Sequence, residues 1–134
     1  MIRIIQLMTE KNHFLEKFNS INDRQIVKLE AKNYEDIENF YNARENLIKI
    51  IKYLDKEIYK AHQQHKELNA VFTIRQKEVL KESLKKKEAL VSKIIEQDVT
   101  VLSLIDQAKT EIIKELQDVK NTQKAMKQYD KSVA

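Results

Sequence analysis

Residues 37–72, IENFYNARENLIKIIKYLDKEIYKAHQQHKELNAVF, decide the fold class of this chain. Their apolar side chains recur at steps of three, four or seven, at Ile37, Phe40, Leu47, Ile51, Leu54, Ile58, Ala61, Leu68 and Phe72. This spacing is typical of a helix that packs one face against other helices. The 134 residues contain no glycine and no proline, so the chain lacks the usual interruptions of long helices. We therefore expect an all-α fold.

The composition fits one globular helical domain over residues 1–134, with 42% hydrophobic and 34% charged residues. The net charge of +4 is mild, and the one basic run, residues 85–87, is flanked by Glu82 and Glu88. Nucleic-acid binding requires a concentrated basic face or aromatic side chains interleaved with arginine. We interpret the basic run as a solvated helix face and expect no nucleic-acid partner.

Catalysis and membrane insertion are both disfavoured by the residue inventory. Cysteine is absent, and the carboxylate-bundle pattern Glu-x-x-His occurs once, at Glu10 and His13. A second pair, His62 and His65, lies in polar surroundings, so we expect no metal, no cofactor and no enzymatic activity. No apolar stretch approaches the roughly 20 residues of a membrane span. The apolar start, residues 1–8, is too short for a signal peptide, and the sequence predicts a soluble cytoplasmic protein.

Two breaks divide the chain into helices over about residues 3–32, 34–70 and 74–130. Asn33 is a suitable N-cap for the second helix, with Glu35 and Asp36 in its first turn. Thr73 followed by Gln76 has the form of a capping box for the third. The prediction is an elongated antiparallel three-helix bundle whose third helix is the longest.

Residues that repeat every seven positions can be aligned between neighbouring helices. In an antiparallel pair, residues at the same level have numbers with a constant sum. The alignment predicts a sum of 66 for the first and second helices and a sum of 142 for the second and third. Polar interruptions then fall on one layer, at Asn22, Arg44 and Asp98. We expect Arg44 to bind the Asp98 carboxylate and Asn22 to take a remaining hydrogen bond, so that the layer sets the register. The alternative is that helix rotation turns each of the three toward water.

The third helix is predicted to run past the first two beyond Ile105, yet its apolar stripe continues through Ile112, Leu116, Val119, Met126 and Tyr129. Such a stripe needs a partner. A bend at Asn121 and Thr122 would fold it back on the bundle, a second copy would pair with it, or an apolar helix of a client protein would bind along it. The residues alone favour client binding and self-association equally.

Two stretches resemble the flagellar export chaperones of the FliT type. Residues 33–58, NYEDIENFYNARENLIKIIKYLDKEI, are similar to the second helix of that family, with an aromatic and acidic start and an arginine before paired aliphatics. Residues 94–129, IIEQDVTVLSLIDQAKTEIIKELQDVKNTQKAMKQY, are similar to its third helix, including the aspartate after paired aliphatics and the closing tyrosine. The likeness covers residues 29–129, and the chaperones of the hook-filament junction proteins share much of it.

The resemblance implies a cytoplasmic chaperone that binds the C-terminal region of the filament cap protein and docks on the export gate and export ATPase. Arg44 and Asp98 match the family's internal polar positions, and Tyr129 matches the tyrosine associated with gate docking. Only residues 130–134 follow that tyrosine, whereas longer members cover their binding surface with a further segment. The competing hypotheses are a structural coiled coil that acts by self-association and a chaperone for hook-filament junction or other secreted proteins.

Overall fold

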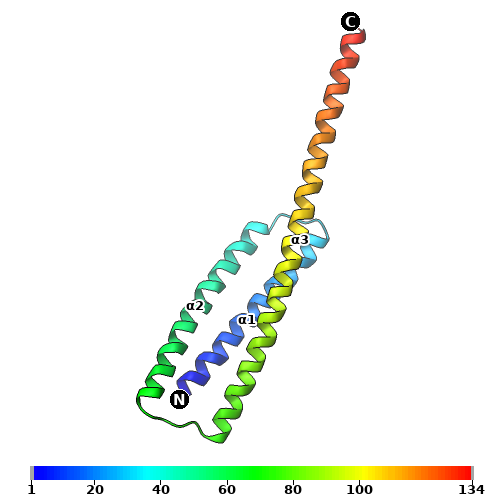
Figure 1. The fold of residues 1–134 in the computed structure, drawn as a ribbon. Coiled ribbons are helices and arrows are strands. Elements are labelled where there is room, and N and C mark those ends of the chain that lie inside the picture. The colour runs from blue at the N-terminus through cyan, green and yellow to red at the C-terminus, as the bar shows by residue number, and fades with distance from the viewer. Residues whose placement is uncertain (1, 134) are drawn as a thin grey trace.

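The computed structural model describes residues 2–133, and over this range the chain forms three α-helices and no strand. They are α1 (Ile2–Glu30), α2 (Ile37–Glu67) and α3 (Ile74–Val133). Figure 1 shows α1 and α3 running in one direction and α2 in the opposite direction, with the upper part of α3 projecting alone. The predicted all-α three-helix bundle is confirmed.

The start of α2 differs from the prediction. The helix begins at Ile37 rather than residue 34, and its N-cap residue Asp36 makes no side-chain capping bond. The Asn33 Oδ1 atom instead accepts a hydrogen bond from the Glu35 backbone N–H at 3.2 Å, so Asn33 stabilises a turn within the connection. The Lys28 ammonium donates to Asp36 Oδ2 at 2.6 Å, so this carboxylate pairs with the end of α1.

Both connections leave their helices through a left-handed residue that is not glycine. Lys32 and Asn69 have φ values of 57° and 50°. At the first, Asn33 N–H donates to Lys28 C=O at 2.9 Å and Lys32 N–H to Leu29 C=O at 3.0 Å, which is a Schellman motif. Asparagine tolerates this conformation better than lysine because its short side chain can bond locally. The two helices end at Glu30 and Glu67, two to three residues before their predicted ends.

The predicted capping box at the start of α3 is confirmed. Gln76 N–H donates to Thr73 Oγ1 at 3.2 Å, and Thr73 N–H donates to Gln76 Oε1 at 2.8 Å. The preceding Phe72 stacks on the His65 ring with centroids 4.1 Å apart. Phe72 also packs on the lower core, so the connection closes that end of the bundle.

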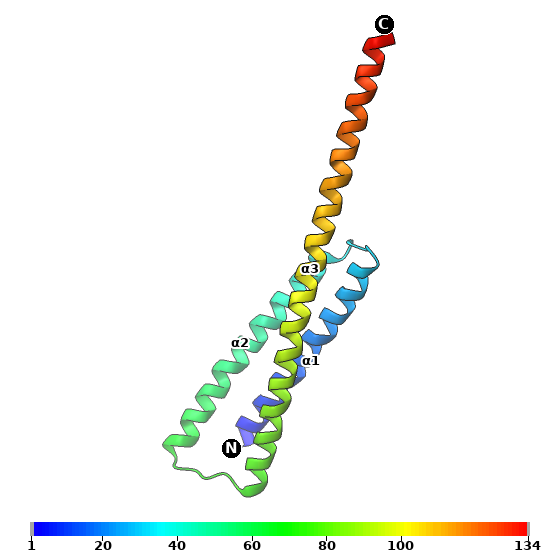
Figure 2. The same ribbon diagram turned by 45° about the vertical axis from the view of Figure 1, so that its right-hand side comes forward.

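The core has two apolar clusters, and α1 lies against both other helices in each view (Figures 1 and 2). The lower cluster is formed by Ile4, Leu7, Leu54 and Ala61. The upper cluster is formed by Leu29, Phe40 and Val101. Two ion pairs agree with the predicted register. Lys11 of α1 binds Asp55 of α2 at 2.5 Å, and their residue numbers sum to 66. Arg44 of α2 binds Asp98 of α3 at 2.8 Å, and their residue numbers sum to 142.

Beyond Ala108, α3 has no covering element, and each residue from 109 to 131 is exposed. We call residues 109–131 the overhang. The bend at Asn121 and Thr122, one of the three alternatives for the stripe, does not form: the backbone stays helical there, and the Thr122 hydroxyl donates to the Asp118 carbonyl at 2.9 Å. The overhang therefore does not fold back on the bundle (Figure 2).

Candidate binding surface on the overhang

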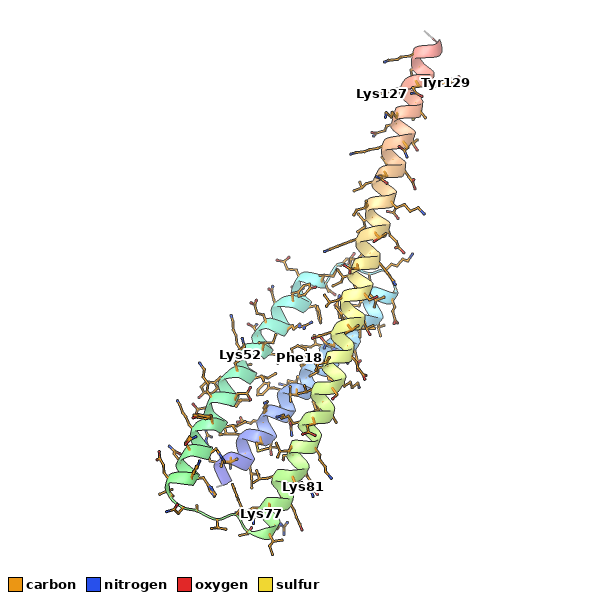
Figure 3. All side chains as sticks on the ribbon, viewed as in Figure 1. Phe18, Lys52, Lys77, Lys81, Lys127 and Tyr129 are labelled. Atoms are coloured by element: carbon orange, nitrogen blue, oxygen red, sulfur yellow. The ribbon has the colours of Figure 1, made fainter. Side chains whose placement is uncertain are left out.

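The overhang carries the apolar stripe that the sequence predicts as a binding surface. We define the stripe as the five residues Ile112, Leu116, Val119, Met126 and Tyr129, whose exposed fractions run from 46% to 69%. At 100° per residue the first four lie within one 80° sector of the helix, and Tyr129 lies to one side of it. Figure 3 places Tyr129 near the far end of the overhang. The structure leaves the whole stripe open to solvent.

The stripe continues the face that α3 presents to its own bundle. Val101 and Val119 are eighteen residues apart, which is five helical turns, so they lie on the same face. Val101 is 1% exposed in the upper cluster, whereas Val119 is 53% exposed. Ala108 and Met126 have the same separation, and they are 8% and 63% exposed. The overhang thus repeats a core-facing surface with no core in front of it.

Charge is divided unevenly along this part of α3. Residues 106–118 hold four acidic and two lysine side chains, whereas residues 119–131 hold four lysines and one acidic side chain. We call these segments the acidic root and the basic tip. Lys32 of the α1–α2 connection reaches Glu111 of the root at 3.5 Å. Lysines near a helix C-terminus also interact favourably with the helix dipole.

The predicted polar layer forms, with one change of partner. The Arg44 guanidinium donates to Asp98 Oδ2 at 2.8 Å and lies over the Phe18 ring, 5.1 Å from its centroid. Asn22 is fully buried, but its Nδ2 donates to Gln97 Oε1 at 3.1 Å rather than to the Arg44–Asp98 pair. The Oδ1 atoms of Asn22 and Asp98 have no partner. The layer joins all three helices and is a structural element of the bundle.

Gln97 is the centre of this layer, although it was not among the predicted polar residues. Its Nε2 lies 2.7 Å from both Asn19 Oδ1 and Asp23 Oδ1, and 3.1 Å from the Asn19 carbonyl. The signal was present, because position 97 faces inward between Ile94 and Val101. A buried amide at such a position requires partners on the facing helix.

Glu10 and His13, the one Glu-x-x-His pair of the sequence, lie in the first half of α1. His13 lies edge-on to Phe14 with centroids 5.7 Å apart, and Glu10 is exposed. Among residues 2–133, no group of three or more acidic or histidine side chains has the arrangement of a metal site. None of the described helices is long and apolar enough to cross a membrane.

Comparison with known proteins identifies no relative. No protein-family model matches the chain, and no curated protein or solved structure matches it.

Proposed function

We propose that this protein is a non-enzymatic chaperone that binds an amphipathic helix of an export substrate along the stripe. The observation that carries the proposal is the continuity of α3: the same face is buried at Val101 and open at Val119. A helix bound there would replace the neighbours that the overhang lacks. Its apolar anchors would be spaced three and four residues apart, as in other helix-in-groove complexes.

The energetics suit reversible capture. Full burial of one leucine, isoleucine or valine side chain contributes roughly 1.5–3 kcal/mol, whereas association itself costs about 4–15 kcal/mol. The stripe offers three aliphatic residues, Met126 and Tyr129, and tyrosine is enriched at interface hot spots. Such a surface binds a client tightly enough to keep its apolar helix from aggregating, and weakly enough to release it for export.

The finer assignment rests on the resemblance to FliT-type chaperones. It supports the C-terminal region of the filament cap protein as the client, the export gate and export ATPase as docking partners, and the cytoplasm as the location. The Arg44–Asp98 ion pair is compatible with it, since both residues match the family's internal polar positions. Under this proposal the bundle is a rigid support, and the overhang is the part that touches the client and the gate.

Co-purification tests the proposal. The full-length chain is co-expressed with the C-terminal segment of the filament cap protein from the same genome, and complex formation is measured by size-exclusion chromatography. We expect a complex that the double variant Leu116→Asp, Val119→Asp weakens by about 100-fold or more, because two apolar anchors become charged. The control Gln117→Asp, Asn121→Asp adds the same charges off the stripe and should bind as the natural chain does.

The same assay distinguishes between the candidate clients. If the chain elutes alone in the presence of the cap-protein segment, the filament cap protein is not its client. Parallel co-expression with the C-terminal segments of the hook-filament junction proteins then tests the second candidate. If the Leu116→Asp, Val119→Asp variant binds a client as well as the natural chain, the stripe is not the binding surface.

A further inference from the structure

The connection between α2 and α3 exposes three large aliphatic side chains. Leu68, Val71 and Ile74 are 78%, 80% and 80% exposed, and we call these three residues the end patch. They lie at the end of the molecule opposite the free end of the overhang (Figure 1). Large aliphatic side chains that a fold gathers and leaves in solvent mark a contact with another surface.

The connection holds the end patch in a fixed position. Phe72 turns inward, where it packs on the lower cluster and stacks on the His65 ring. The capping box of Thr73 and Gln76 fixes the start of α3 at Ile74. The end patch is therefore a preformed surface, and contact with a partner requires little ordering of the backbone.

The α1–α2 connection, at the other end of the bundle, has no such feature. Its large apolar residues, Tyr34 and Ile37, are partly buried against the upper cluster. A connection in this fold can thus cover its apolar side chains with the bundle. The exposure of the end patch is specific to residues 68–74.

Cations outnumber acids around the end patch. Residues 66–81 hold four exposed cations and two exposed acids, which are Lys66, Arg75, Lys77 and Lys81 against Glu67 and Glu78. Within residues 2–133, none of these four cations forms an ion pair. Figure 3 shows Lys77 and Lys81 near the lower end of α3. Residues 28–38, at the other connection, hold two lysines and four acids, so the two ends of the bundle carry opposite charge.

We propose that the end patch docks this chain on an anionic lipid surface as a peripheral protein. The three aliphatic side chains enter the interfacial region, and the surrounding cations contact anionic head groups. Lysine and arginine suit this position, since their stems pack along apolar surface while their charged ends stay in water. A fluid lipid surface accommodates a projecting end of a bundle without a complementary cavity.

An open depression beside the end patch extends the apolar surface. It has a volume of about 340 Å³, and its walls include Ile5 of α1 and Val79 and Arg75 of α3. A guanidinium binds a phosphate oxygen through charge-assisted hydrogen bonds. A lipid phosphate that binds Arg75 therefore has apolar side chains next to it.

Docking through this end leaves the stripe accessible. Helix α3 begins at Ile74 and runs away from the end patch, so the overhang points away from the lipid surface (Figures 1 and 2). At about 1.5 Å per residue, the start of the overhang lies roughly 50 Å along the helix from Ile74. Lipid docking and client binding use opposite ends of α3, and the inference does not depend on the identity of any client.

Co-sedimentation of the full-length chain with lipid vesicles tests the proposal. Vesicles of phosphatidylcholine alone are compared with vesicles in which about one third of the lipid is phosphatidylglycerol. We expect binding to the anionic vesicles, roughly 10-fold or more weaker binding to phosphatidylcholine alone, and weaker binding as the salt concentration rises. A chain that stays in the supernatant with the anionic vesicles overturns the proposal and leaves the end patch to a protein partner.

Two matched triple variants test the aliphatic side chains. The combination Leu68→Ser, Val71→Ser and Ile74→Ser should weaken binding to the anionic vesicles by roughly 10-fold or more, because the inserted apolar surface is lost. The control combination Val27→Ser, Val99→Ser and Leu102→Ser changes side chains that are 64%, 65% and 61% exposed elsewhere on the bundle, and it should bind as the natural chain does. Circular dichroism checks that both variants keep the natural helical content. Equal binding by the two variants contradicts insertion of the end patch.

Charge reversal distinguishes the lower end of the bundle from the overhang. The combination Lys66→Glu, Arg75→Glu and Lys77→Glu should weaken binding by roughly 100-fold or more, because three attractive charges become repulsive. The combination Lys120→Glu, Lys124→Glu and Lys127→Glu makes the same change in net charge in the basic tip and should keep most of the binding. If only the basic-tip variant loses binding, the overhang meets the lipid and the proposal is wrong.

Tryptophan fluorescence locates the contact, since the chain has no tryptophan of its own. The single-tryptophan variants Val71→Trp and Val99→Trp place the reporter in the end patch and on the exposed middle of α3. Anionic vesicles should shift the emission of the Val71→Trp variant to shorter wavelength and leave that of the Val99→Trp variant unchanged. An unchanged spectrum of the Val71→Trp variant would show that the end patch does not enter the lipid.

Discussion

The two halves of α3 share one apolar pattern and differ in what lies in front of it. Through Ala108 the inward face packs on α1 and α2, whereas from residue 109 to 131 the same face meets solvent. Helices α1 and α2 have 29 and 31 residues, and α3 has 60. Periodicity therefore determines which face of a helix is apolar, and the lengths of the neighbouring helices determine where that face is covered.

The largest expected effect comes from making one substitution in both halves. Val101→Asp places a carboxylate at a site that is 1% exposed, and it should destabilise the bundle by about 4 kcal/mol or more or prevent folding. Val119→Asp, five turns later on the same face, should change the free energy of unfolding by less than about 0.5 kcal/mol. Urea unfolding followed by circular dichroism measures both. Equal destabilisation by the two changes would show that the overhang is covered in solution.

A second matched pair compares buried and exposed glutamine. Gln97→Ala removes the partner of Asn22 and Asn19 inside the bundle, and unsatisfied buried groups cost about 1–3 kcal/mol each. We expect a loss of roughly 2–3 kcal/mol in the free energy of unfolding. Gln117→Ala in the overhang should have no measurable cost, since alanine is the better helix former. A neutral Gln97→Ala would mean that water satisfies the layer in its absence.

Ion pairs give the third comparison. Arg44 and Asp98 are 22% and 30% exposed at their side chains, whereas Lys32 and Glu111 are 69% and 50% exposed. A double-mutant cycle on the half-buried pair should give a coupling of about 1–2 kcal/mol, between the values typical of surface and buried pairs. The cycle on Lys32 and Glu111 should give less than about 0.5 kcal/mol. A coupling near zero for Arg44 and Asp98 would remove their role in setting the register.

The bundle was predictable from the sequence because its signals are local or periodic. Leu47 and Leu54 recur on one helical face, Thr73 and Gln76 form a self-contained cap, and the polar residues Arg44 and Asp98 align once two helices are set antiparallel. Each inference needed only helix geometry. The overhang was predictable from the helix lengths, because the third helix has more residues than the first two helices can cover.

The parts that were missed depend on contacts between distant segments. Gln97 lies on the inward face of α3, but its partners are on α1, more than seventy residues away in sequence, so the pattern of α3 alone does not identify them. Asn33 was predicted as a helix cap, but the left-handed Lys32 before it and the Lys28–Asp36 pair move the start of α2 to Ile37. The identity of the stripe's partner depends on another polypeptide, so neither periodicity nor this fold specifies it.

A change in pH should have a smaller effect on the free energy of unfolding. The Lys86 ammonium donates to Glu16 at 2.5 Å and lowers the pKa of that carboxyl below its ordinary value. A lowered folded-state pKa contributes stability above the unfolded pKa, and this contribution is lost as the pH falls through the folded pKa. Because the pair is exposed, we expect at most about 0.5 kcal/mol. Thermal unfolding between pH 6 and pH 3 should show a shallower decline for Lys86→Met than for the natural chain, and no such change for Lys124→Met in the overhang.

Removal of the end of the overhang should have the smallest effect on the free energy of unfolding. Truncation after Lys120 removes part of the overhang, in which no residue from 121 to 131 is buried, so the free energy of unfolding should stay within about 0.5 kcal/mol of its full-length value. The helical signal in circular dichroism should fall only by the residues removed. The same cut deletes Met126 and Tyr129 from the stripe, so client binding should be lost. Unfolding of the whole protein by this cut would show that the overhang supports the bundle, and the distinction between the two halves of α3 would fail.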